Sequence, residues 1–148
     1  MNMHTVLIVF LTIMAWGTAR AADPCENVPP RNPVNQTKQT SGTLVIGDTP
    51  GETLVIPAGT QWLHNGSIRI IKEGSLLIDG GELHLQGNDT HIYVSGNGRL
   101  TFRNGAHFHY EQDYVAQHIL YGYGNARILF SDATVDSNGS TESIRMLL

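Results

Sequence analysis

A repeat of about 24 residues constrains this chain more than any other feature, because a fixed period of this length is the sequence signature of a repeat architecture. Three segments, residues 67–88, 91–112 and 118–139, align so that short alternating apolar runs fall at matching positions. A looser copy begins at Leu44, one period before Ile68. The first apolar pairs of the three segments are Ile68/Ile70, Ile92/Val94 and Ile119/Tyr121.

Two more apolar groups follow in each repeat. The second pairs are Leu76/Ile78, Leu100/Phe102 and Ile128/Phe130, and the third group is Leu83/Leu85, Phe108/Tyr110 and then Val135 alone. Alternation of this kind predicts short strands with one buried face, and no stretch shows helical periodicity. The turns between them carry residues that adopt positive φ most easily. These turn positions are Gly74, Gly80-Gly81, Gly98, Asn104-Gly105 and Gly124-Asn125.

Three short strands per repeat predict one coil of a solenoid. A single coil cannot bury its inward apolar residues, so they must stack on equivalent residues of the neighbouring coils. An antiparallel meander or sandwich would also alternate. The solenoid is favoured because the period holds over four units and the turns are short and regular. We therefore expect an all-β fold, a right-handed parallel β-helix of about four coils, over residues 42–148.

The start of the chain indicates export. An apolar run from Val6 to Trp16, followed by Ala19-Arg20-Ala21, is typical of a signal peptide over residues 1–21. A membrane anchor is the alternative, but the run is well short of the about 20 residues that span a bilayer. Residues 22–41 are rich in Pro, Asn and Thr and are expected to form a flexible leader. The expected localisation is secreted, either extracellular or periplasmic.

The net charge argues against some classes of partner, and the cysteine content excludes an internal disulfide. The net charge is −4, and loss of residues 1–21 with Arg20 would make it about −5. This balance argues against nucleic acid or an anionic membrane surface as a partner. Cys25 is the only cysteine, so an internal disulfide is excluded and stability must come from packing.

The stretches from Gly74 to Gly80 and from Gly98 to Gly105 share a G-x-L-x-I/F pattern that ends at a glycine. In coil length and in this pattern, residues 42–148 resemble the N-terminal portion of right-handed parallel β-helix proteins of the pectin lyase-like superfamily. The resemblance implies a secreted lyase, hydrolase or binder of polysaccharides, or an adhesin. It specifies architecture rather than activity. The hydrolase strings N-T-D, D-D, G-H-G and R-I-K are absent, and the aspartates fall at different coil phases. No catalytic residue is therefore assigned.

One group of polar residues remains as a candidate site. If Leu83, Phe108 and Val135 point inward, the residues that follow them form an outward ladder, and Glu82, His107 and Thr134 form a second ladder beside it. Such a face can be an ordinary solvated surface, a sugar-binding strip, or a metal or acid–base site. We take it as a candidate glycan-binding face, with no metal and no cofactor. Its residues are Glu82, His84, Arg103, His107, His109 and Asp136.

The last residues, "SIRMLL", begin a further coil at Ile144, about one repeat after Ile119. We expect an open C-terminal coil, which indicates either the N-terminal piece of a longer β-helix or self-association through that end. The expected function is a secreted module of a polysaccharide-binding or polysaccharide-processing protein, non-catalytic as it stands. The alternatives are a lyase- or hydrolase-like enzyme fragment, with His107, His109 and Arg103 near its site, and a structural surface protein or adhesin.

Overall fold

The computed structural model describes residues 32–111, 119–137 and 146–147, and these ranges contain twelve strands and no helix. The expected signal peptide, the first half of the expected leader and the segment from residue 112 to residue 118 lie outside the described residues. No helix long and apolar enough to cross a membrane occurs in the described part of the chain. The strands are β1 (Gln36–Ser41), β2 (Leu44–Ile46), β3 (Thr53–Pro57), β4 (Thr60–Asn65), β5 (Ile68–Ile70), β6 (Ser75–Asp79), β7 (Glu82–Gln86), β8 (Ile92–Gly96), β9 (Arg99–Tyr110), β10 (Leu120–Gly124), β11 (Arg127–Ser137) and β12 (Met146–Leu147).

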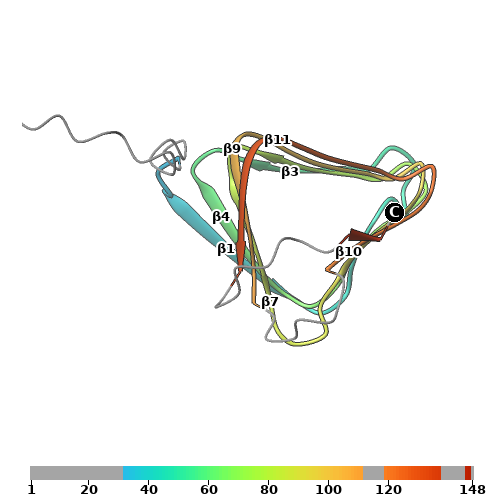
Figure 1. Ribbon diagram of the computed structural model, residues 1–148, viewed down its shortest axis with the longest axis horizontal. Coiled ribbons are helices and arrows are strands. Elements are labelled where there is room, and N and C mark those ends of the chain that lie inside the picture. Colours follow the sequence, from blue (N-terminus) through green and yellow to red (C-terminus); the bar gives the residue numbers. More distant parts are fainter. Residues whose placement is uncertain (1–31, 112–118, 138–145, 148) are drawn as a thin grey trace, which may run out of the picture.

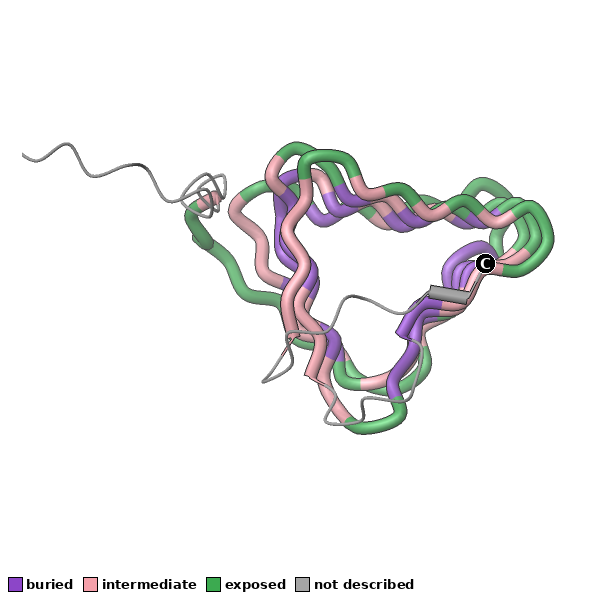
Figure 2. The backbone as a smooth tube through the Cα atoms, in the orientation of Figure 1, coloured by how far each residue is buried: buried purple, intermediate pink, exposed green. Residues whose placement is uncertain are grey.

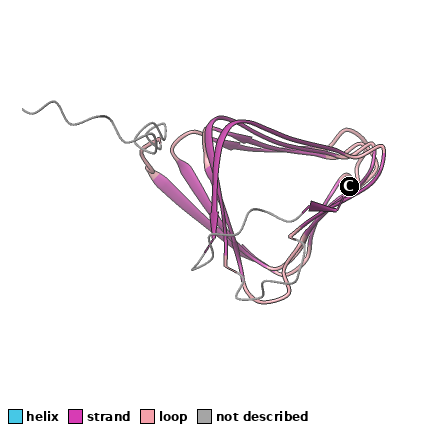
Figure 3. Ribbon diagram, in the orientation of Figure 1, coloured by secondary structure: helices cyan, strands magenta, loops and turns pink. Residues whose placement is uncertain are grey.

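The strands wind into a solenoid of about four turns with a triangular cross-section (Figures 1 and 3). The first face consists of β2, β5, β8, β10 and β12, all parallel. The second face consists of β3, β6 and the first halves of β9 and β11. The third face consists of β1, β4, β7 and the second halves of β9 and β11. The two long strands therefore turn the corner between the second and third faces.

The strand register confirms the repeat on the second and third faces. Leu76 pairs with Leu100, which pairs with Ile128. On the third face, Leu83 pairs with Phe108, which pairs with Val135. These are the alignments that the apolar pairs predicted, because alternating apolar residues can be buried in one register only.

The inward residues fill the lumen of the coil. Figure 2 shows that buried residues occur along all three faces. Trp62, Leu83 and Phe108 form one stack across β4, β7 and β9, and each is at most 1% exposed. Full burial of one such side chain contributes roughly 1.5–3 kcal/mol. Continuous stacking from coil to coil is thus what holds the fold together, as expected for a chain without an internal disulfide.

The glycines at the turns have two different structural roles. Gly80 and Gly105 have φ of 74° and 76°, as predicted for turn positions. Gly74 and Gly98 do not have positive φ, so this part of the prediction was wrong. They are needed for space instead, because a Cβ at Gly74 would lie 2.4 Å from the carbonyl oxygen of Ile46, in the preceding coil.

The first apolar pair of the third repeat was predicted one residue out of register. Leu120, not Ile119, pairs with Ile92, and Tyr121 pairs with Tyr93. Tyr121 therefore points outward, although the pattern placed it in the lumen. Ile119 and Leu120 are adjacent, equally apolar and both buried, so alternation alone could not decide between the two registers.

The solenoid begins earlier than the boundary expected at residue 42. β1 lies in the segment assigned to the leader and pairs along its length with β4. Thr40 of β1 connects it to the lumen, because its hydroxyl accepts a hydrogen bond of 2.7 Å from Trp62 Nε1 and lies 2.8 Å from His64 Nδ1. Ile144 lies outside the described residues; β12 continues the first face through the pairing of Met146 with Leu120.

Candidate functional site

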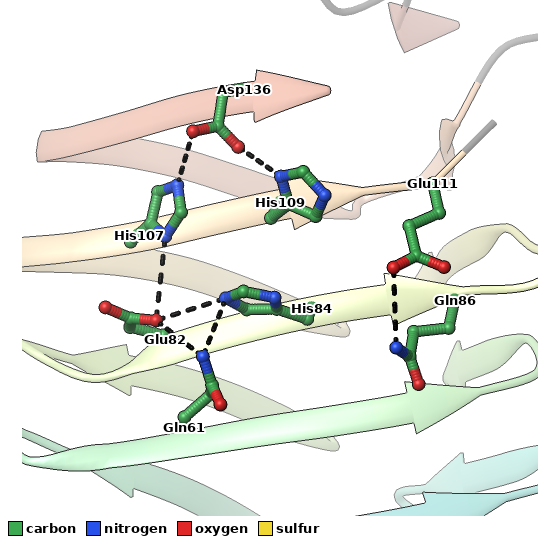
Figure 4. Close-up of polar contacts among 8 residues, drawn as sticks. All are labelled: Gln61, Glu82, His84, Gln86, His107, His109, Glu111 and Asp136. Atoms are coloured by element: carbon green, nitrogen blue, oxygen red, sulfur yellow. Dashed lines mark hydrogen bonds and ion pairs between the residues drawn. The ribbon is translucent and has the colours of Figure 1, made fainter. Parts of the chain in front are cut away.

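The register brings five of the six predicted site residues together on the third face. Glu82 pairs with His107 and His84 with His109 between β7 and β9, and Asp136 of β11 pairs with His109. We call these five residues the histidine–carboxylate cluster; Figure 4 shows them as neighbours on three successive strands. The two ladders that alternation predicted are confirmed as positions in the sheet.

The cluster is joined by polar contacts from one coil to the next. Glu82 Oε2 lies 3.1 Å from His84 Nε2, and it accepts a hydrogen bond of 3.1 Å from Gln61 Nε2 in the preceding coil. In the following coil, His107 Nε2 lies 3.0 Å from Asp136 Oδ2. The other oxygen of Asp136 is hydrogen-bonded to His109 Nδ1. Each carboxylate therefore lies between two nitrogen-bearing side chains.

His107 is the most buried member of the cluster. It is 1% exposed and Glu82 is 8% exposed, although both lie at outward positions of the sheet. The rings of His84 and His109 lie 5.6 Å and 6.3 Å from the ring of His107 and help to cover it. Neither nitrogen of His107 makes a contact with the angles of a hydrogen bond, and Nδ1 is 3.8 Å from Glu82 Oε2. A buried imidazole without a hydrogen bond is rare and calls for an explanation.

The surroundings shift the pKa values in the cluster. Burial raises the pKa of Glu82, but hydrogen bonds from Gln61 and His84 and the nearby His107 outweigh it, so the net shift is downward. The pKa of Asp136 is lowered in the same way, because its contacts with His109 and His107 outweigh burial. Burial lowers the pKa of His84, and Glu82 opposes this only in part. Near neutral pH the two carboxylates are therefore ionised and His84 is neutral.

Arg103 does not join the cluster. Its guanidinium donates a hydrogen bond of 2.8 Å to Asp79 Oδ2, and Asn104 Nδ2 donates one of 2.6 Å to the other oxygen of Asp79. This group lies where β9 turns from the second face to the third. The hydrogen bond from Arg103, followed by that from Asn104, lowers the pKa of Asp79. Arg103 thus pairs with Asp79 at a corner of the coil and does not lie with the histidines.

A second group of candidate functional side chains, which sequence reasoning missed, lies on the first face. Tyr93 of β8 stacks on Tyr121 of β10, with ring centroids 5.0 Å apart and 17° between the planes. Tyr123 continues the row along β10, 6.3 Å from Tyr121 with 8° between the planes, and is 49% exposed. We call these three residues the tyrosine row. His91 packs against Tyr93 and Tyr121, at 5.6 Å and 5.3 Å, and supports the row from one side.

Two members of the tyrosine row, Tyr93 and Tyr123, line an open groove of about 650 Å³. Arg69 pairs with Tyr93 from the opposite side to Tyr121, because β8 lies between β5 and β10. Arg69 is exposed. The groove thus combines aromatic rings, one guanidinium and several hydroxyl groups. Its lining residues are Thr43, Ser67, Arg69, Ile71, Tyr93, Ser95 and Tyr123.

The sequence contained a signal for this groove. Tyr93 stands between the inward residues Ile92 and Val94, and Tyr123 follows Tyr121 by two residues, which puts both on one side of a strand. The predicted register was wrong by one residue at Ile119, so it placed Tyr121 in the lumen and the tyrosine row was not recognised.

The chain was compared with protein-family models, with curated proteins and with solved structures, and none of the three comparisons found a match.

Proposed function

We propose that this chain is a secreted β-solenoid module that binds an acidic polysaccharide, and that the groove beside the tyrosine row holds the sugar chain. A family relationship with pectin lyase-like β-helix proteins is part of the same proposal, supported by the coil length and the glycine-bounded repeat. The observation that carries the proposal is that Tyr93, which stacks on Tyr121, lines one groove together with Tyr123 and Arg69.

The side chains of the groove suit the chemistry of sugars. Sugar rings have apolar faces that pack on aromatic rings, and their hydroxyl groups need polar partners such as Ser67 and Ser95. Arg69 offers a planar fork of donors that matches a carboxylate, so a uronate residue is favoured over a neutral sugar. A volume of about 650 Å³ lies within the range of small-molecule sites.

The stacked arrangement also limits the cost of binding. One side of Tyr93 is occupied by Tyr121, so the ring is held in place before a ligand arrives. A rigid site loses less conformational entropy on binding than a mobile one. Burial, followed by the neighbouring Tyr121 and Tyr123, raises the pKa of Tyr93, so its hydroxyl stays protonated and can donate a hydrogen bond at neutral pH.

The test is a calorimetric titration of the full chain with oligogalacturonate and, separately, with a neutral oligosaccharide of the same length. We expect binding of the uronate oligomer, weakened at least about tenfold by Tyr123→Ala and by Arg69→Ala, since one lost stacking or charged contact costs about 1.4 kcal/mol or more. Arg127→Ala is the matched control, because it removes the same charge from the second face.

Two outcomes would contradict the proposal. One is equal binding of the wild type and the two groove variants. The other is loss of binding in Arg127→Ala with retention in Arg69→Ala, which would place the ligand on another face. The same incubations, followed by ultraviolet absorbance for newly formed double bonds, test the alternative of a lyase-type enzyme.

A further inference from the structure

We propose that Glu82, His84 and His107 bind a divalent first-row transition metal ion of the Zn²⁺ type on the third face. This inference is independent of the proposed sugar groove, which lies on another sheet. It assigns to the histidine–carboxylate cluster a ligand that the sequence analysis did not assign to it.

The positions of three ligand atoms carry the first part of the argument. Glu82, His84 and His107 each offer one ligand atom, and these atoms all lie within 4.8 Å of one another. Glu82 Oε2 is 3.1 Å from His84 Nε2 and 3.8 Å from His107 Nδ1. Tetrahedral Zn²⁺ has bonds of about 2.0–2.1 Å, which places its ligand atoms about 3.3 Å apart. The two distances from Glu82 Oε2 lie within about 0.5 Å of that separation.

The orphaned nitrogen of His107 is the second, independent observation. His107 is 1% exposed, and its Nδ1 has no hydrogen bond. At 3.8 Å, Glu82 Oε2 is too far away to accept one. Burial of a polar atom without a partner is costly. A metal ion between His107 Nδ1, His84 Nε2 and Glu82 would supply the missing partner, because a ring nitrogen offers its lone pair to a cation.

The surrounding residues match the outer shell that metal sites require. His107 Nε2 faces Asp136 Oδ2 at 3.0 Å, and a carboxylate at this nitrogen favours the tautomer that leaves Nδ1 free to bind metal. On the other side, Gln61 Nε2 donates to Glu82 Oε2 at 3.1 Å and orients that carboxylate. Asp136 and Gln61 are therefore positioning residues rather than ligands in this assignment.

The donor set indicates which metals fit. Two imidazole nitrogens and one carboxylate suit Zn²⁺ and its first-row neighbours, whereas Ca²⁺ and Mg²⁺ prefer oxygen ligands throughout. Three protein ligands leave a fourth position for water or another small molecule. The His84 side chain is 18% exposed, so the site is reached from its edge.

A second triad, formed by His107, His109 and Asp136, also has ligand atoms within 4.8 Å of one another. The first triad is favoured for two reasons. In the first triad His107 would bind through Nδ1, which has no partner within hydrogen-bonding distance, whereas in the second it would bind through Nε2, which already faces Asp136 Oδ2 at 3.0 Å. The Asp136 side chain is also more exposed than that of Glu82, at 39% against 10%.

The experiment uses the full chain, freed of metal with a chelator and titrated with Zn²⁺ in competition with a chromogenic chelator. We expect one Zn²⁺ per chain and no comparable binding of Ca²⁺. Substitution with Co²⁺ should give the strong visible absorption of a tetrahedral site with nitrogen and oxygen ligands. Weak octahedral absorption with Co²⁺, or Ca²⁺ binding as tight as that of Zn²⁺, would overturn the proposal.

Variants then locate the ion. His84→Gln and Glu82→Gln should each weaken Zn²⁺ binding by more than about 100-fold, because loss of an outer-shell partner alone costs about 10–100-fold. Asp136→Asn, which changes an outer-shell partner, should weaken Zn²⁺ binding by only about 10–100-fold. His91→Gln, the same substitution on the first face, is the matched control and should bind like the wild type. If His109→Gln abolishes binding while His84→Gln retains it, the assignment to the first triad is overturned.

Circular dichroism of each variant separates metal loss from unfolding. Zn²⁺ should also raise the melting temperature of the wild type, because a ligand that binds only the folded state stabilises it. Glu82→Gln keeps the volume of the side chain and can still form hydrogen bonds without the charge, so this variant should fold. Its melting temperature should not rise with Zn²⁺. A rise of equal size in a folded Glu82→Gln variant would contradict the proposal.

Discussion

Phe102 and Phe130 stack face to face across β9 and β11, with ring centroids 4.7 Å apart and 3° between their planes. Phe102 also contacts Phe108, at 5.2 Å, where the same strand has turned onto the third face. One buried ring thus connects two coils and two faces of the solenoid. Aromatic pairs of this kind contribute about 0.5–1.5 kcal/mol beyond the burial of their area.

Phe102→Ala should therefore lower the free energy of unfolding by about 3–5 kcal/mol, the usual cost of removing a buried phenylalanine. The measurement is urea unfolding followed by circular dichroism. Thr101→Ala is the control, because Thr101 lies on the same strand at an outward position and should change the free energy by less than about 0.5 kcal/mol. Equal effects in the two variants would show that the lumen at Phe102 is not packed as described.

Gly74→Ala should destabilise the fold although Gly74 has an ordinary φ. A Cβ there would lie 2.4 Å from the carbonyl oxygen of Ile46 and 2.8 Å from the Cα of Gly47, both of which are backbone atoms. The two coils would have to separate locally, and overpacking of this kind typically costs about 1–3 kcal/mol. Thermal unfolding of Gly74→Ala beside Ser75→Ala measures the effect. A melting temperature equal to that of Ser75→Ala would refute the close approach.

Thr40→Val should weaken the attachment of β1. The hydroxyl of Thr40 is the partner of two lumen side chains, Trp62 Nε1 and His64 Nδ1, and valine has the same shape without the oxygen. Leaving a buried donor without a partner costs about 1–3 kcal/mol. Thr37→Val, at an exposed position of the same strand, is the control. Hydrogen exchange of the β1 amides should accelerate in Thr40→Val alone; unchanged exchange would count against this account.

His64 should make stability depend on pH. Burial lowers its pKa below the ordinary 6.5, and nearby backbone groups at Ser67 and Gly42 oppose this only in part. Between the lowered pKa and 6.5, the unfolded chain binds a proton that the folded chain does not. The free energy of unfolding should therefore be at its full value above pH 6.5 and fall as the pH decreases toward the lowered pKa.

The measurement is the urea midpoint at a series of pH values from 7.5 to 5, for the wild type and for His64→Gln. Other titrating groups contribute to the slope in both proteins, so the difference between the two slopes isolates His64. The slope should be smaller in His64→Gln. An identical slope in the two proteins would show that His64 is not held neutral in the folded state.

The ladder of Glu82, His84, His107 and His109 was predictable from the alternation of apolar residues. Leu83, Leu85 and Phe108 alternate with these residues, and burial of the apolar ones leaves a single register in which the polar ones face outward. The same reasoning failed at Ile119 and Leu120, where two apolar residues stand side by side. Both are buried, and only the pairing of Leu120 with Ile92 shows that Tyr121 joins Tyr93 outside.

By itself, the sequence determined the parallel solenoid, its coil length and which residues line most of the lumen, because a period that holds over four units with short turns favours stacked coils over an antiparallel arrangement. The tertiary structure alone decided that His107 is buried among outward-facing residues and that Arg103 pairs with Asp79 at a corner. The reason is that burial and pairing depend on side chains from neighbouring coils and on the bend of β9, and one strand's pattern contains neither.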